Sequence, residues 1–81
     1  TRRLLLEFEH WDKSHPFIMT TLKTKGITID NMDLEVKRVA DEAFRTYSVI
    51  YTMTLPRDLD EHQLMLDLSD SPEILKVRIL N

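Results

Sequence analysis

No cysteine occurs among the 81 residues of this chain, and glycine occurs only once. Without cysteine, disulfide bonds, thiolate metal sites and thiol nucleophiles are excluded, and a reducing, cytoplasmic location is favoured. With Gly26 alone, the glycine-rich loops that bind nucleotide phosphates are excluded as well. Ser14 and His15 are adjacent, and adjacent residues do not form the geometry of a catalytic triad. The sequence therefore favours a non-enzymatic module that needs no cofactor.

Long apolar runs and basic clusters are also missing. The run Leu4-Leu5-Leu6 is far shorter than the roughly 20 residues that a transmembrane helix needs. The chain has 11 basic and 14 acidic residues, for a net charge of −3. Nucleic-acid binding would need a basic stripe, so we expect no nucleic-acid partner.

The length bounds the organisation of the chain. Residues 1–81 are enough for one domain and not for two. A domain of this size buries only about 60–65% of the surface that its unfolded chain exposes, so a homodimer or another protein partner would add stability. The chain opens at Thr1 without Met and enters an apolar segment almost at once. We therefore expect it to be a fragment of a longer protein.

Alternation of apolar and polar residues predicts four strands, at residues 2–10, 27–39, 47–55 and 73–80, with a turn at 40–43. In the second strand the parity of the apolar residues switches at Asp30-Asn31, which predicts a bulge or a bend. In the other three strands, the apolar residues that share a face are Leu4, Leu6 and Phe8; Tyr47, Val49, Tyr51, Met53 and Leu55; and Leu75, Val77 and Ile79.

Two helices are predicted between the strands. The first follows a loop at residues 11–15, with Ser14 or His15 at the N-cap and Pro16 in the first turn. Gly26 is expected to end it in a left-handed conformation.

The second helix is predicted over residues 59–68. Asp58 and Glu61 have the spacing of a capping box at its start. Its expected core contacts are Leu64, Met65 and Leu68.

The resulting order, strand–helix–strand–strand–helix–strand, is that of the ferredoxin-like α+β fold. Right-handed crossovers then place both helices on one face of a four-stranded antiparallel sheet. The second face is expected to carry Leu5, Ile50, Ile74 and Leu80 among charged and hydroxyl residues. A sheet face of this kind is typical of a dimerising or docking module.

Residues 9–32 resemble the first half of an ACT domain, with a strand ending near Asp12, a helix, and Lys25-Gly26-Ile27-Thr28-Ile29 opening the next strand. Within that ACT-like class, the whole chain is similar to the C-terminal domain of the MgtC/SapB family of membrane proteins. The similarity lies in three stretches besides the strand at 47–55. They are Arg2-Arg3-Leu4, Gly26-Ile27-Thr28-Ile29 and Ser71-Pro72-Glu73-Ile74-Leu75-Lys76-Val77-Arg78-Ile79.

This resemblance implies a parent protein with an N-terminal bundle of membrane helices, in a family associated with growth in low magnesium and with virulence. The chain would then be a regulatory or dimerisation domain on the cytoplasmic side of the bacterial inner membrane. An alternative is an amino-acid effector-binding ACT domain of a metabolic enzyme. Such domains carry a glycine after the first strand, and residues 12–17 contain none, while Pro16 lacks the N–H that could hold a carboxylate.

The candidate site residues are His10, Trp11, Asp12 and His15, around the predicted first strand-to-helix loop. They could form a ligand or partner interface, with Trp11 as the anchor. A third hypothesis is a divalent metal sensor that uses His10, Asp12 and His15, although their spacing matches no established ligand pattern and a solvated capping loop is the simpler interpretation.

A second acidic group lies near the start of the predicted second helix. Asp58, Asp60 and Glu61 could bind Mg²⁺ or Ca²⁺ through their carboxylates. Helix capping and the helix dipole already explain acidic residues at such a position, so we interpret them as structural.

Overall fold

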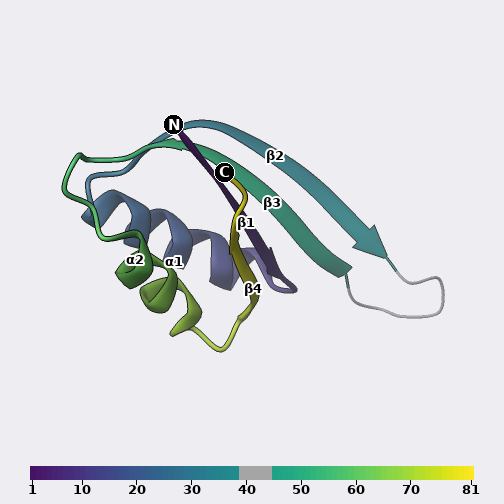
Figure 1. Cartoon of the computed structure of the whole chain (residues 1–81). Helices are drawn as coiled ribbons and strands as arrows, with labels where there is room; N and C mark the ends of the chain where they lie inside the picture. Colours follow the sequence, from purple (N-terminus) through teal and green to yellow (C-terminus); the bar gives the residue numbers. More distant parts are fainter. Residues whose placement is uncertain (39–44) are drawn as a thin grey trace.

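A computed structural model of the chain describes residues 1–38 and 45–81 (Figure 1). Its elements are β1 (Arg2–Phe8), α1 (Trp11–Thr24), β2 (Thr28–Arg38), β3 (Arg45–Thr54), α2 (Glu61–Ser69) and β4 (Ile74–Ile79). The predicted βαββαβ order is confirmed. The predicted turn at residues 40–43 lies outside the described residues.

The four strands form one antiparallel sheet in the order β2-β3-β1-β4. Both helices lie against one face of this sheet, and the other face is open (Figure 1). The predicted ferredoxin-like, ACT-like architecture is therefore confirmed. β1 and β3 are the central strands, whereas β2 and β4 each have one edge that pairs with no other strand among the described residues.

The core lies between the sheet and the helices. It is made of fully or almost fully buried apolar side chains from five segments: Leu4, Leu6 and Phe8; Ile18 and Leu22; Ile27; Val49, Tyr51 and Met53; and Leu64 and Leu68. Each aliphatic side chain buried in this way contributes about 1.5–3 kcal/mol relative to an exposed one. The predicted faces of the first and third strands are thus confirmed.

The start of α1 differs from the prediction. The helix begins at Trp11 with His10 as its N-cap, and Ser14 and Pro16 lie inside it. The Ser14 N–H donates to the His10 carbonyl over 2.9 Å, so Ser14 is within the helical ladder and is not its cap. Pro16, in the second turn, cannot donate a hydrogen bond to the carbonyl of the exposed Asp12, and its ring crowds that carbonyl, so it weakens the helix there.

The end of α1 agrees with the prediction. Gly26 has a φ of +75°. The Ile27 N–H donates to the Leu22 carbonyl and the Gly26 N–H to the Lys23 carbonyl, each over 3.0 Å. These two bonds define a Schellman motif, and the motif delivers Ile27 into the core.

The cap of α2 is Asp60, and the prediction of Asp58 was wrong. The Asp60 carboxylate accepts a 3.1 Å hydrogen bond from the Gln63 N–H. Residues 56–59 form a separate turn, closed by the Leu59 N–H and the Pro56 carbonyl at 3.2 Å. This turn delays the start of the helix to Glu61.

Two irregularities interrupt the sheet. The register between β2 and β3 shifts between Ile29 and Asn31, which confirms the bulge predicted from the parity switch. A second shift, between β1 and β4, was not predicted: Glu7 faces Lys76, but Phe8 faces Ile74.

The second shift changes the faces of the sheet on which two neighbouring residues of β4, Ile74 and Leu75, lie. Leu75 was predicted to share the core face, but it is 55% exposed. Ile74 was predicted on the open face, but it packs against the core. A one-residue bulge exchanges the faces of the residues beyond it, which explains both errors.

Candidate functional site

The four predicted site residues surround the start of α1, and the structure brings only two of them together. Only Glu9 and His10 separate β1 from α1. His10 and Asp12 are exposed, and the His10 side chain makes no cap hydrogen bond. Trp11 and His15 lie one helical turn apart and stack, with 4.4 Å between ring centroids and 11° between ring planes.

Trp11 also connects α1 to the two central strands. Its ring lies 5.8 Å from that of Phe8 on β1 and 5.6 Å from that of Tyr47 on β3. Phe8 and Tyr47 in turn stack on each other, with 5.8 Å between centroids. We call Phe8, Trp11, His15 and Tyr47 the aromatic cluster. Phe8 and Tyr47 complete this cluster, and the periodicity that placed both on one face is the sequence signal for them.

Tyr51 extends the aromatic cluster into the core. Its hydroxyl lies 3.5 Å from the Nδ1 atom of His15. Burial of the ring disfavours the phenolate and raises the pKa of Tyr51 to about 12. Tyr51 therefore keeps a protonated hydroxyl beside the His15 ring well into alkaline pH.

A second feature lies beside the aromatic cluster, on β2. Met32, Leu34 and Val36 face Tyr51, Val49 and Tyr47 in the register, so they lie on the helix side of the sheet. They are nevertheless 41%, 48% and 40% exposed. Figure 1 shows the reason, because β2 and β3 reach past the two helices. We call Met32, Leu34 and Val36 the β2 stripe.

The open face is less apolar than the β2 stripe. Leu5 and Ile50 are half-buried and face each other in the register. In the same row, Asp33 lies on one side of this pair and Arg78 on the other. The open face is therefore a charged surface with a small aliphatic centre.

Cross-strand charges also link the strands on this face. Glu7 and Lys37 form an ion pair of 3.4 Å. Leu80 continues the edge beyond β4, where its N–H donates to the Arg3 carbonyl over 2.8 Å. The β2 stripe is therefore more apolar than the open face, and its exposure was not predicted from the sequence.

The hypothesis of a divalent metal site gains no support from the described residues. Among residues 1–38 and 45–81, no three His, Asp or Glu side chains come together as a metal ion would require. Two acidic residues at the start of α2 have structural roles: Asp60 caps the helix, and Glu61, its first residue, pairs with Arg2 at 3.0 Å. In the described part of the chain, no helix is long and apolar enough to cross a membrane.

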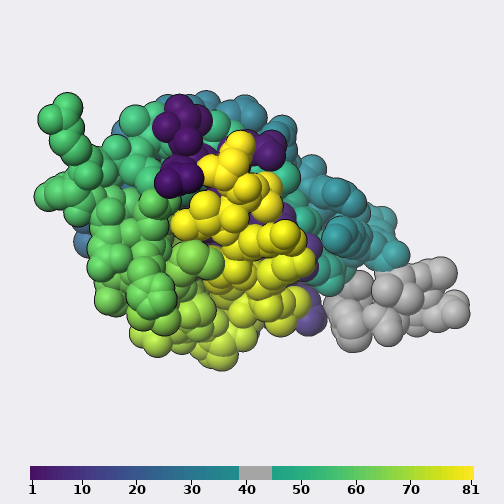
Figure 2. Space-filling model, in the orientation of Figure 1, coloured from purple at the N-terminus to yellow at the C-terminus, as the bar shows by residue number. Residues whose placement is uncertain are grey.

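Two hollows lie away from the predicted site. One, of about 360 Å³, lies between α2 and β4 and is lined mainly by apolar atoms, including those of Met65, Leu66 and Leu75. Figure 2 shows α2 (green) and β4 (yellow) side by side on this face. The other, of about 310 Å³, lies between α1 and α2, near the ion pair of Lys25 and Asp67.

The fold and the site thus define an ACT-like module with an aromatic cluster at the start of α1 and, among its described residues, two free sheet edges. No family model matches the sequence, and no match is found among the curated proteins. The chain resembles the solution structure of the C-terminal domain of the MgtC protein from Mycobacterium tuberculosis, with a TM-score of 0.69. The match covers 98% of this chain and 83% of that one, at 11% sequence identity. The resemblance predicted from the sequence is therefore confirmed as a shared fold.

Proposed function

We propose that this chain is a non-enzymatic regulatory or dimerisation domain of an MgtC/SapB-like membrane protein linked to magnesium homeostasis or virulence. It would lie on the cytoplasmic side of the bacterial inner membrane. The observation that carries this proposal is the structural match over 98% of the chain. The exposed β2 stripe supports the assembly role in particular.

The argument for assembly starts from the edge strand. β2 has 11 residues, and its outer edge pairs with no described strand. An edge strand of this length offers a row of unpaired N–H and C=O groups. The β2 stripe adds apolar side chains to one face of that edge. Together they provide both the hydrogen bonds and the apolar area that a second chain can bury.

The argument against catalysis starts from the aromatic cluster. Its polar groups are the imidazole of His15, the hydroxyl of Tyr47 and the indole N–H of Trp11, and the neutral hydroxyl of Tyr51 lies next to His15. His15 is stacked on Trp11, which suits packing more than proton transfer. No cysteine is present to act as a nucleophile.

Sedimentation equilibrium of the 81-residue chain, with and without Mg²⁺, tests the proposal. We expect self-association that does not depend on Mg²⁺. Leu34→Ser should weaken it several-fold, because each copy loses a half-exposed leucine worth about 1 kcal/mol when buried. Met19→Ser is the matched control, since Met19 is 36% exposed and lies on α1 rather than on an edge strand. A chain that stays monomeric at high concentration would refute the dimerisation role.

The effector-binding alternative has its own test. A thermal-shift screen of the 20 amino acids should show no stabilisation if the domain serves assembly. A ligand present at 100 times its Kd would add about 2.7 kcal/mol to stability. Such a shift from any amino acid would favour the effector-binding alternative.

A further inference from the structure

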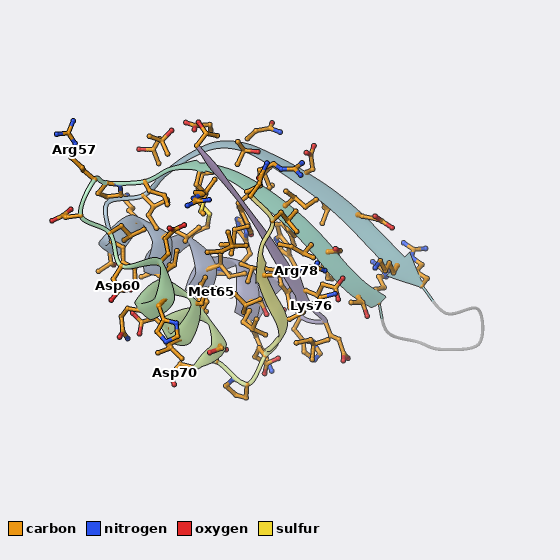
Figure 3. All side chains as sticks on the ribbon, in the orientation of Figure 1. Arg57, Asp60, Met65, Asp70, Lys76 and Arg78 are labelled. Atoms are coloured by element: carbon orange, nitrogen blue, oxygen red, sulfur yellow. The ribbon has the colours of Figure 1, made fainter. Side chains whose placement is uncertain are left out.

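In two neighbouring rows of the open face, the two edges of the sheet carry opposite charges. One row of the register runs Asp33, Ile50, Leu5 and Arg78, from β2 across to β4. The next row runs Glu35, Ser48, Glu7 and Lys76. Both rows begin with an acid at the β2 edge and end with a base at the β4 edge. Figure 3 labels the two basic residues along β4.

The two edges also differ on the helix side of the sheet. The β2 stripe is apolar and has no helix over it. β4 instead lies beside α2, and the apolar hollow of about 360 Å³ opens between them. Leu66 and Leu75, at 49% and 55% exposure, line this hollow and are among the most exposed large apolar residues of the domain. One edge thus offers uncovered apolar side chains, and the other offers an apolar recess.

We propose that β2 of one copy adds to β4 of a second copy of this chain and extends the sheet from one molecule to the next. The inference rests on the proposed assembly function and specifies its geometry. β1 and β2 both run antiparallel to β3, and β4 runs antiparallel to β1, so β2 and β4 are antiparallel within one chain. Copies that follow one another in the same orientation therefore form an antiparallel β2–β4 pair.

In one register of this β2–β4 pair, the opposed side chains are complementary on both faces of the sheet. It sets Asp33 opposite Arg78 of the second copy and Glu35 opposite Lys76 of the second copy. On the helix side, Met32 and Leu34 then face Ile79 and Val77 of the second copy, next to the hollow. Opposite charges and apolar pairs directly across a strand pair are each stabilising. The pattern is consistent at four successive positions, so it specifies register as well as partner.

Pairing of like edges is disfavoured by the same charges. Two β4 edges bring the bases Lys76 and Arg78 together. Two copies could also pair antiparallel through their β2 edges. In three registers of such a pair, Leu34 of one copy lies opposite Met32, Leu34 or Val36 of the other. These registers oppose Asp33 to Asp33, Asp33 to Glu35, or Glu35 to Glu35. The third register also sets Asp33 opposite Lys37, but the Lys37 ammonium is already paired with Glu7 of its own chain. Because like charges directly across a strand pair are destabilising, the unlike edges are the better partners. A contact between unlike edges is heterologous, so the assembly grows head to tail with concentration.

Disulfide trapping tests the geometry, since the chain has no cysteine of its own. Residues 35 and 76 are separated by β3 and β1 within one molecule, so a bond between them must join two molecules. Opposed residues of an antiparallel pair have Cα atoms about 4.5–5.5 Å apart, within reach of a disulfide. We expect a mixture of Glu35→Cys and Lys76→Cys to form a mixed disulfide under mild oxidation, with little of either homodimer. A predominant Glu35→Cys homodimer would overturn the proposal in favour of paired β2 edges.

Charge exchange provides the second readout. Asp33→Arg and Arg78→Asp lie in a row whose other members, Ile50 and Leu5, carry no charge. Each change should weaken self-association about tenfold, as expected when an exposed ion pair becomes a repulsion. The double variant, with the charges exchanged, should recover to within about threefold of the original. Asp58→Arg and Arg57→Asp make the same charge changes at exposed positions outside the strands, in the loop before α2, and should have no effect. Figure 3 labels Arg57.

These experiments distinguish failure of the β2–β4 pairing from failure of the proposed assembly function. Self-association that persists in both single variants would overturn the β2–β4 pairing and leave the assembly function standing. Failure of the double variant to recover would also overturn it. A chain that is monomeric in every form would refute self-assembly as a whole and point to a different protein as the partner.

Discussion

The imidazole of His15 lies flat on the indole of Trp11, with 4.4 Å between their ring centroids and 11° between their planes. Through Trp11 this stack reaches Phe8 and Tyr47, so it fixes the start of α1 to both central strands. His15 also reaches the hydroxyl of Tyr51. The cluster is therefore a structural joint between the helix and the sheet, beside the exposed β2 stripe.

Replacement of Trp11 should destabilise the domain more than replacement of His15. Trp11→Leu loses three aromatic contacts, and we expect a loss of about 2–4 kcal/mol of unfolding free energy. His15→Ala loses one stack and should cost about 0.5–1.5 kcal/mol. Urea unfolding followed by circular dichroism measures both changes. This readout does not need tryptophan fluorescence, which the Trp11→Leu variant lacks. An equal or larger loss for His15→Ala would show that Trp11 is not the centre of the cluster.

The cap of α2 gives a paired test. Asp60 accepts a hydrogen bond from the Gln63 N–H, whereas Asp58 lies in the preceding turn. Asp60→Ala should therefore cost about 1 kcal/mol, and Asp58→Ala should change stability by no more than about 0.5 kcal/mol. Thermal unfolding of the two variants compares them directly. A larger loss of stability for Asp58→Ala than for Asp60→Ala would mean that Asp58 is the N-cap, as the sequence predicted.

Strand parity and the single glycine were sufficient to predict most of the fold. Alternation places Leu4, Leu6 and Phe8 on one face whatever they pack against, and Gly26 is the only residue without a Cβ to oppose a positive φ. The switch at Asp30 is also visible locally, because both parities appear within one strand.

The errors have a different origin, since each depends on contacts between distant residues. The bulge that exposes Leu75 is set by pairing with β1. The early start of α1 places Trp11 against Phe8 and Tyr47. Exposure of the β2 stripe depends on where the helices end, because Met32, Leu34 and Val36 alternate as they would in a covered strand. Trp11 and His15 were predicted as site residues, but their stacking required the helix to begin four residues before His15.

Ser14 is a position where substitution should raise stability. Its side chain is fully buried, and its hydroxyl contacts no hydrogen-bond partner among the described residues. A buried, unpaired hydroxyl costs about 1–3 kcal/mol, and alanine is the better helix former. Ser14→Ala should therefore stabilise the domain, by about 1 kcal/mol or more. Ser69→Ala is the control, because the exposed Ser69 hydroxyl already donates to the Leu66 carbonyl at 2.9 Å. Destabilisation by Ser14→Ala would mean that the hydroxyl has a partner.

The buried Tyr51 should make the domain sensitive to alkali. Its pKa is about 12 in the folded chain, against 10.0 as the ordinary value, because burial disfavours the phenolate. Between these two pH values the unfolded chain releases the proton while the folded chain keeps it. The folded state then binds more protons, so stability falls as pH rises, by up to about 2–3 kcal/mol across the window. The contribution is fully present below pH 10 and is lost as pH approaches 12.

Tyr51→Phe removes this titration and isolates it. Urea unfolding of both proteins at pH 8 sets the baseline difference, which includes the lost contact to His15. From pH 9 to 12 the original chain should lose stability relative to the variant, since all other titrating groups are common to both. Curves that remain parallel across this range would mean that the hydroxyl ionises equally well in the folded and unfolded chains. The hydroxyl would then be open to water in the folded chain, which would contradict its burial next to His15.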